Sequence, residues 1–173
     1  GGFRSSSTWT ANPRIIEALD EAFYLAFGSV EPSGKRISLN LDVSGSMGFG
    51  NNVLPGMTAR DASAAMALIT INTEPYVVFR GFTGESNSVS YLSVNALTDL
   101  PITKKDRIGD AIKKVSRLPF GATDCALTMV YAKENGLKYD TFVIYTDNET
   151  WAGGIQPFEA LREYRESSGI NTR

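Results

Sequence analysis

Apolar residues recur along this chain in a pattern that predicts helices alternating with short strands. Residues 13–27 carry apolar side chains at helical spacing, with Asn12 placed to cap the helix and Gly28 placed to end it. Three later runs rich in apolar residues are typical of strands: residues 37–41, 76–82 and 141–145. The run at 141–145 has no polar face, which indicates a strand covered by helices on both sides.

Helical patterns fill the intervals between these strands. Thr58 and Asp61 resemble a capping box, and the helix after them presents one predicted face, made of Ala62, Ala65, Met66 and Ile69. The next helix begins near Thr103 or Asp106, with a stripe formed by Ile108, Ile112, Val115 and Leu118. Two more helices are predicted at about residues 124–137 and 156–168, the last burying Leu161 and Tyr164. A short strand at residues 89–94 is expected to form a hairpin with residues 76–82.

This alternation predicts an α/β fold, with an open, largely parallel, doubly wound sheet and helices on both faces. We expect residues 1–11 to form a flexible arm. Residues 12–34 should form a helix and a turn that pack on the domain, and residues 35–173 should form the domain itself.

The end of the first predicted strand carries the candidate chemistry. Asp42, Ser44 and Ser46 follow the strand at alternating positions, and a carboxylate with small hydroxyls is a ligand set that suits Mg²⁺. Asp147 ends the strand at 141–145, and Thr123 lies in a loop that enters a helix. Because ligands bind beyond the carboxyl ends of parallel strands, all five side chains should meet at one rim of the sheet. They are the predicted metal ligands. Mn²⁺ and Ca²⁺ are the alternatives to Mg²⁺.

Composition limits the classes of function. The chain has 173 residues, which suits one domain, and its net charge of -2 argues against binding nucleic acid through bulk electrostatics. Histidine is absent, which excludes Ser-His-Asp and Cys-His catalysis. Cys125 is the single cysteine, so it is expected to pack as a small apolar residue in a reducing compartment. With no apolar run of about 18 residues, we expect a cytoplasmic protein with no membrane partner.

The candidate residues also resemble a known motif. Residues 42–46 (Asp-Val-Ser-Gly-Ser), 121–123 (Gly-Ala-Thr) and 146–147 (Thr-Asp), in this order, are similar to the metal-ion-dependent adhesion site (MIDAS) of von Willebrand factor type A domains. Further segments resemble the carboxy-terminal A domain of the Ro60 autoantigen (TROVE-domain) family: residues 17–24, 30–36, 118–125, 145–152 and 160–165. The resemblance covers most of the chain from Trp9 onward. Ala122 departs from it, standing where the family usually has a second glycine.

This resemblance implies a partner protein, RNA and a metal. Ro proteins are RNA-binding ring proteins of RNA quality control, in which a circle of helical repeats binds small Y RNAs and the ends of misfolded noncoding RNAs. The A domain closes the ring and carries a divalent cation, whose open position would attract an acidic protein ligand or a phosphate oxygen. The family continues beyond the equivalent of Arg173, so we expect the sheet to lack its last strands.

The leading interpretation is therefore a non-catalytic metal-binding recognition or scaffold domain of a Ro-type protein. One alternative is a Mg²⁺-dependent phosphohydrolase, although Ser44 stands where such an enzyme would need a second acid near Asp42. An integrin-like adhesion module is the other alternative. Glu149 and Trp151 lie just beyond Asp147 and are expected to serve loop packing rather than ligand contact.

Overall fold

The computed structural model describes residues 12–48, 52–54, 56–83, 97–116, 122–147 and 153–173. The chain divides into two compact units, Gly1–Glu31 and Pro32–Arg173, and each is described by itself. The predicted flexible arm at residues 1–11 lies outside the described residues. Within the described part of the chain, no helix is both long and apolar enough to cross a membrane.

The first unit contains α1 (Pro13–Ala26) and the 3-10 turn η1 (Phe27–Ser29). The predicted cap is confirmed, because the Asn12 side chain accepts a hydrogen bond from the Arg14 N–H at 3.0 Å. Ile15 and Leu19, on the predicted stripe, are 56% and 65% exposed, so this unit does not bury them. The packing of this helix on the domain stays a prediction.

A four-stranded sheet forms the centre of the second unit. It comprises β5 (Leu97–Asp99), β4 (Tyr76–Phe82), β1 (Arg36–Asp42) and β6 (Thr141–Tyr145), in that spatial order. The central strand β1 pairs in parallel with β4 and β6, whereas β5 pairs with β4 in the antiparallel sense. A separate antiparallel pair is formed by β2 (Asn52–Leu54) and β3 (Met57–Thr58). The predicted largely parallel α/β sheet is confirmed.

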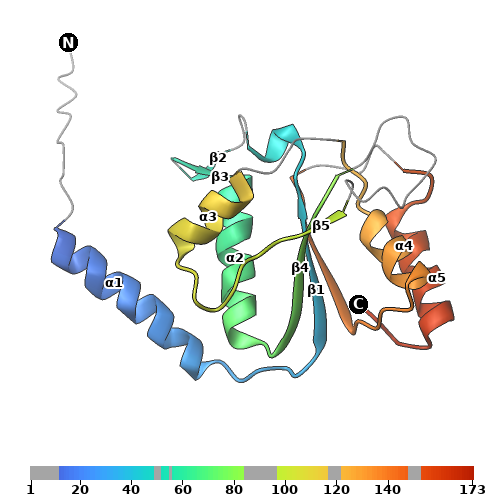
Figure 1. The fold of residues 1–173 in the computed structure, drawn as a ribbon, viewed down its shortest axis with the longest axis horizontal. Helices are drawn as coiled ribbons and strands as arrows, with labels where there is room; N and C mark the ends of the chain where they lie inside the picture. The colour runs from blue at the N-terminus through green and yellow to red at the C-terminus, as the bar shows by residue number, and fades with distance from the viewer. Residues whose placement is uncertain (1–11, 49–51, 55, 84–96, 117–121, 148–152) are drawn as a thin grey trace, which may run out of the picture. The chain divides into compact units, whose positions relative to one another are not determined.

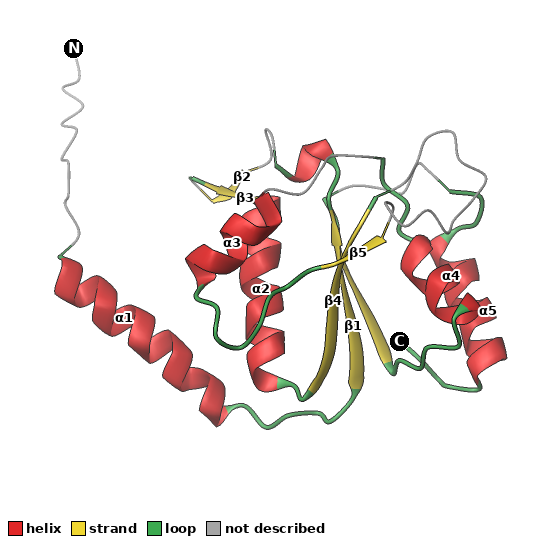
Figure 2. Cartoon of the chain, in the orientation of Figure 1, coloured by secondary structure: helices red, strands yellow, loops and turns green. Residues whose placement is uncertain are grey.

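Helices cover both faces of the sheet (Figure 1 and Figure 2). On one face lie α2 (Ala59–Thr73) and α3 (Ile108–Ser116), and on the other lie α4 (Leu127–Glu134) and α5 (Pro157–Ser168). The predicted capping box of α2 is present, and α5 also begins with a capping box, which was not predicted. Helix α4 is shorter than the predicted 124–137. Tyr164 of α5 is buried as predicted, while Leu161 is only half-buried.

The predicted buried face of α2 is wrong. The helix instead buries a neighbouring stripe, made of Ala64, Ala67, Leu68 and Ile71, and Met66 from the predicted face is 56% exposed. Small and apolar residues occur on several sides of this helix, so more than one stripe fits a helical period. The helix packs on the sheet with the stripe whose alanines allow the backbones to come close and whose Leu68 side chain fills the space between them.

The edge beside β4 pairs with a strand that the sequence did not predict. The predicted strand at residues 89–94 lies outside the described residues. The antiparallel partner of β4 among the described residues is β5, with Leu97 opposite Phe82. This strand has only three residues, two of them polar, so it carries no alternating pattern from which it could be predicted.

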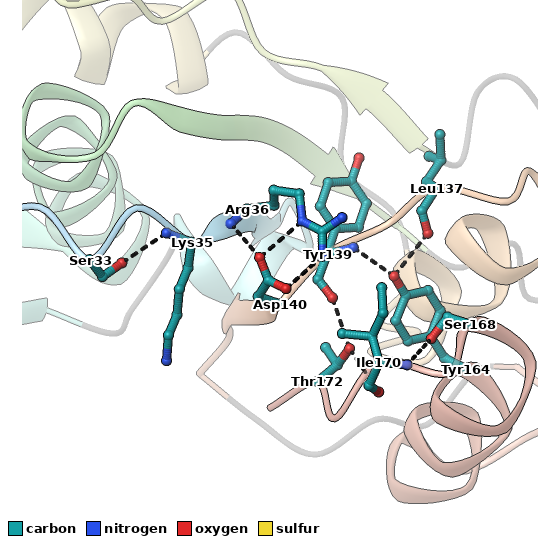
Figure 3. Close-up of polar contacts among 10 residues, drawn as sticks. All are labelled: Ser33, Lys35, Arg36, Leu137, Tyr139, Asp140, Tyr164, Ser168, Ile170 and Thr172. Atoms are coloured by element: carbon teal, nitrogen blue, oxygen red, sulfur yellow. Dashed lines mark hydrogen bonds and ion pairs between the residues drawn. The ribbon is translucent and has the colours of Figure 1, made fainter.

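A polar network secures the amino end of β6 (Figure 3). The Arg36 guanidinium donates to both carboxylate oxygens of Asp140, at 2.9 and 2.6 Å, and the Arg36 N–H donates to the same group at 2.8 Å. The buried Tyr164 hydroxyl accepts from the Tyr139 N–H at 2.7 Å and donates to the Leu137 carbonyl at 2.8 Å. These bonds tie β1 and α5 to the start of β6.

The last residues of the chain lie against the outer edge of β6. Thr172 is buried and donates from its hydroxyl to the Tyr139 carbonyl at 2.8 Å. Arg173 donates to the Asp140 carbonyl at 3.1 Å and accepts from the Phe142 N–H at 2.8 Å, which is the bonding pattern of a parallel pair. Within the described residues, this edge of β6 takes its backbone partners from Arg173 alone.

The Arg36–Asp140 pair should make stability depend on acid pH. Hydrogen bonds from the Arg36 side chain and backbone lower the pKa of Asp140 from 3.8 to about 2. A lowered folded-state pKa stabilises the fold above pH ~4, and this stabilisation is lost as pH falls from about 4 towards 2. Asp140→Asn should therefore cost on the order of 1 kcal/mol at pH 6, a value reduced for solvent screening. Urea unfolding should show the difference from wild type shrinking towards pH 2.5.

A matched control removes a more exposed ion pair of the same sheet. The Asp99 carboxylate accepts from Arg80 at 2.8 Å and is 83% exposed, so Asp99→Asn should cost less at pH 6. A difference between Asp140→Asn and wild type that is equal at pH 6 and pH 2.5 would contradict the assigned role of the pair.

Candidate metal centre

The order of the strands brings three loops to one point of the sheet. The chain leaves β1 through α2 to reach β4 on one side, and β6 pairs with the other side of β1. Strand order therefore reverses beside the carboxyl end of β1, which is where open α/β sheets form ligand sites. Hydrogen bonds join the described residues at this point: those directly after β1, those directly after β6, and Thr123 before α4.

Asp42, the last residue of β1, is completely buried at this rim. One carboxylate oxygen, Oδ1, accepts from the Ser44 N–H at 2.7 Å. The other, Oδ2, accepts from the hydroxyl of Thr146 at 2.8 Å and from that of Thr123 at 3.4 Å. The carboxylate thus joins the loop after β1, the loop before α4 and the residue after β6.

A second series of oxygen atoms runs from the same loop to Asp147. The hydroxyls of Ser44 and Ser46 lie 3.1 Å apart, and the Ser46 hydroxyl donates to Asp147 Oδ1 at 3.1 Å. Ser46 is exposed and Asp147 is half-buried, whereas Ser44 and Thr123 are buried. Hydrogen bonds therefore link all five residues predicted as ligands, with the Ser44 N–H joining Asp42 and Thr123 to the series that ends at Asp147.

This donor set fits a hard divalent cation. Every donor is an oxygen atom, and only Asp42 and Asp147 carry charge, which suits Mg²⁺ or Mn²⁺ better than Zn²⁺. Among the described residues, no group of three or more His, Cys, Asp or Glu side chains is placed to hold a metal. Hydroxyl groups would have to complete the coordination sphere. The assignment of the five side chains as metal ligands stays a prediction.

A buried arginine forms hydrogen bonds to the backbone of the loop that follows β1. Arg60, the second residue of α2, is 2% exposed and donates from Nη2 to the carbonyls of Val43 and Ser44, at 2.9 and 3.1 Å. Burial lowers the pKa of Arg60, while the charges of Asp42 and Asp61 act in the opposite direction. The backbone between the predicted ligands is thus held by a charged side chain from a neighbouring helix.

The entry to α4 contains a second buried carboxylate, Asp124. Its side chain accepts from the Ala126 N–H at 3.0 Å, within the turn that leads from Thr123 into α4. Burial raises the pKa of Asp124, and hydrogen bonds from the backbone of Ala126 and Leu127 oppose this effect. Gly153 approaches it closely from the segment after β6, with φ at +90°, and a Cβ there would collide with the Asp124 carboxylate. Asp124 therefore holds the turn directly after Thr123 and lies close to Gly153.

Cys125 packs as the sequence predicts. It is buried in an apolar cluster with Phe82 and Leu127. Glu149 and Trp151, which were expected to serve loop packing, lie outside the described residues.

Comparison with known proteins identifies the family. The family model described as "Ro60 vWA domain" matches residues 36–173. The chain belongs to the Ro60 vWA domain family. Two RNA-binding proteins named RO60 are similar over almost the whole chain: that of Caenorhabditis elegans is 45% identical over 98% of this chain, and that of Deinococcus radiodurans is 43% identical over 97%. A crystal structure of the Deinococcus radiodurans RO (RSR) protein is 42% identical, covers 99% of this chain and gives a TM-score of 0.80.

The chain spans only part of each of these relatives. It covers 25% and 30% of the two RO60 proteins, and 33% of the chain in the crystal structure. The resemblance to the Ro60 family, drawn from segments along most of the chain, is confirmed.

Sequence reasoning missed two residues of this vWA site. Thr146 is predicted only as part of the motif at residues 146–147, whereas its hydroxyl donates to Asp42 at 2.8 Å; a hydroxyl directly after an apolar strand is the signal that could have found it. Arg60 gave no signal, because a charged residue in the first turn of a helix is normally solvated. Its burial depends on how α2 packs beside the loop, which its local sequence does not show.

The close approach of Gly153 to Asp124 yields a prediction for this vWA domain. Gly153→Ala should destabilise the fold in two ways, through the positive φ and through collision with a buried carboxylate. Gly169→Ala is the matched control, because Gly169 has φ of +70° and nothing within 4 Å of an added Cβ. We expect a loss of about 1 kcal/mol for the control and about 2 kcal/mol or more for Gly153→Ala, measured by urea unfolding. Equal losses would show that the contact with Asp124 has no energetic role.

Proposed function

We propose that this chain is a non-catalytic recognition and scaffold domain that binds one divalent cation within a Ro-type RNA-binding protein. The observation that carries the proposal is the meeting of Asp42, Ser44, Ser46, Thr123 and Asp147 through hydrogen bonds at one rim of the sheet. The membership of the Ro60 vWA family supports the context.

The cation would be Mg²⁺, or Mn²⁺ in its place. Asp42 and Asp147 would supply the negative charge, and the three hydroxyls would act as neutral donors. When bound, such an ion attracts an anionic oxygen, because few carboxylates surround it. Ser46 is exposed, so the rim is accessible at that position to a carboxylate or phosphate group of a partner.

The RNA-binding role belongs in this proposal to the whole protein. The relatives are named RNA-binding proteins, and this chain spans a quarter to a third of their length. We assign contact with small noncoding RNA, and the part in RNA quality control, to the helical-repeat ring expected in the parent protein. The chain itself has 19 acidic and 17 basic residues, so its overall charge does not favour RNA.

The metal site predicts a single cation-binding event that depends on Asp42. Mn²⁺ titration followed by electron paramagnetic resonance should show one site per chain. Asp42→Asn should weaken binding at least about tenfold, since it removes one of two ligand charges. Asp140→Asn is the control. It removes the charge of a carboxylate at the opposite end of the same sheet and should leave the Mn²⁺ affinity unchanged. Equal affinity in wild type and Asp42→Asn would refute the site.

If the rest of the protein makes the contacts with RNA, this chain alone should bind RNA weakly. Filter binding at near-physiological salt, with a Y-like hairpin and with a single-stranded tail, should give dissociation constants no tighter than about 1 μM, as for non-specific contact. A sub-micromolar constant that weakens steeply with added salt would instead assign RNA contact to this domain.

A further inference from the structure

The Asp42 carboxylate needs a positive partner when no metal is bound. It is fully buried, and its hydrogen bonds come from neutral groups: the Ser44 N–H and the hydroxyls of Thr123 and Thr146. Hydrogen bonds lower the cost of burying a charge, but an ionised carboxylate away from water also requires charge compensation.

Arg60 is placed to provide this compensation. Its guanidinium bonds to the carbonyls of Val43 and Ser44, the two residues that directly follow Asp42. It is 2% exposed, so water screens its charge little. The charge of Asp42 also favours the protonated form of Arg60, and burial opposes this by lowering its pKa.

The position of Arg60 within α2 supports a role outside the helix. It is the second residue of the helix, where the helix dipole disfavours a positive charge. Asp61, at the next position, already fulfils the helix-capping role by accepting from the Thr58 N–H at 3.1 Å. The buried positive charge of Arg60 is therefore unfavourable for the start of α2. It is stabilised by the loop carbonyls, by Asp42 and by Asp61, and Asp42 is the fully buried carboxylate of the two.

We propose that Arg60 is a built-in counter-charge for Asp42, a positioning residue that keeps the loop at residues 42–46 in its ligand-binding conformation before a cation arrives. Arg60 leaves the site more positive once the cation is bound, and so favours an anionic oxygen from a partner. The counter-charge role holds for the metal-free protein, whereas the effect on a partner rests on the proposed metal-binding function.

The test separates the charge of Arg60 from its hydrogen bonds. Arg60→Lys retains the charge and loses the planar fork, while Arg60→Gln retains an amide donor and loses the charge. Both are made in the wild type and in the Asp42→Asn background, and folding equilibrium constants are measured by urea unfolding in EDTA at pH 7. Arg80→Gln is the control in both backgrounds, because Arg80 is a partly buried arginine that bonds to Tyr139 and Asp99 instead.

With Asp42 intact, Arg60→Gln should lower the folding equilibrium constant about tenfold more than Arg60→Lys does. If Arg60→Gln fails to fold while Arg60→Lys folds, that result supports the proposal equally. In the Asp42→Asn background, this difference should fall below about threefold, and Arg80→Gln should cost the same in both backgrounds. Equal losses for the Lys and Gln variants with Asp42 intact, including failure of both to fold, would overturn the counter-charge. A difference that persists in Asp42→Asn would also overturn it.

A separate measurement without EDTA tests metal binding independently of the counter-charge role of Arg60. Mn²⁺ should raise the melting temperature of the wild-type chain and not that of Asp42→Asn. If Mn²⁺ does not change the melting temperature of the wild type, the proposed metal-binding function is wrong. The comparison of the Arg60 variants in EDTA would still decide whether Arg60 is a counter-charge for Asp42.

Discussion

The buried charge of Asp42 is the constraint on which the rim of this domain depends. A carboxylate with no exposed surface must be surrounded by groups that stabilise its ionised form. Three segments far apart in sequence supply them: the turn after β1, the loop before α4 and the residue after β6. Arg60 adds a buried positive charge from a fourth segment, α2. The same groups that stabilise Asp42 therefore fix the relative positions of the predicted ligands.

The opposite end of the sheet makes this arrangement possible. Parallel pairing in register, with Leu41 opposite Tyr145, sets how far β6 extends beside β1 and so where Thr146 and Asp147 begin. Arg36 and Asp140 lock that register at the amino ends of the two strands. Tyr164 ties α5 to the same corner, so the start of β6 is held both by β1 and by α5.

The sequence could predict the features that depend on local pattern. Asp42 and Asp147 each follow an apolar strand, and parallel strands must place such residues at the same edge. The pattern could not choose between two stripes of α2, because alanine is compatible with either. It also gave no sign of β5, a strand of three residues that carries no alternating pattern and is defined by its pairing with β4. Arg60 lies beyond local reasoning because its burial is a property of tertiary packing.

Membership of the Ro60 vWA family shows the kind of protein to which the chain is related. A bound cation is inferred from the oxygen atoms at the rim of the sheet. The central claim is that the rim holds one hard divalent cation among hydroxyls and two carboxylates. Anomalous diffraction at the manganese edge, from crystals grown with Mn²⁺, tests it most directly. We expect one anomalous peak at the rim, about 2.1 Å from the hydroxyl oxygens of Ser44 and Ser46. A peak elsewhere, with none among these oxygens, would contradict it.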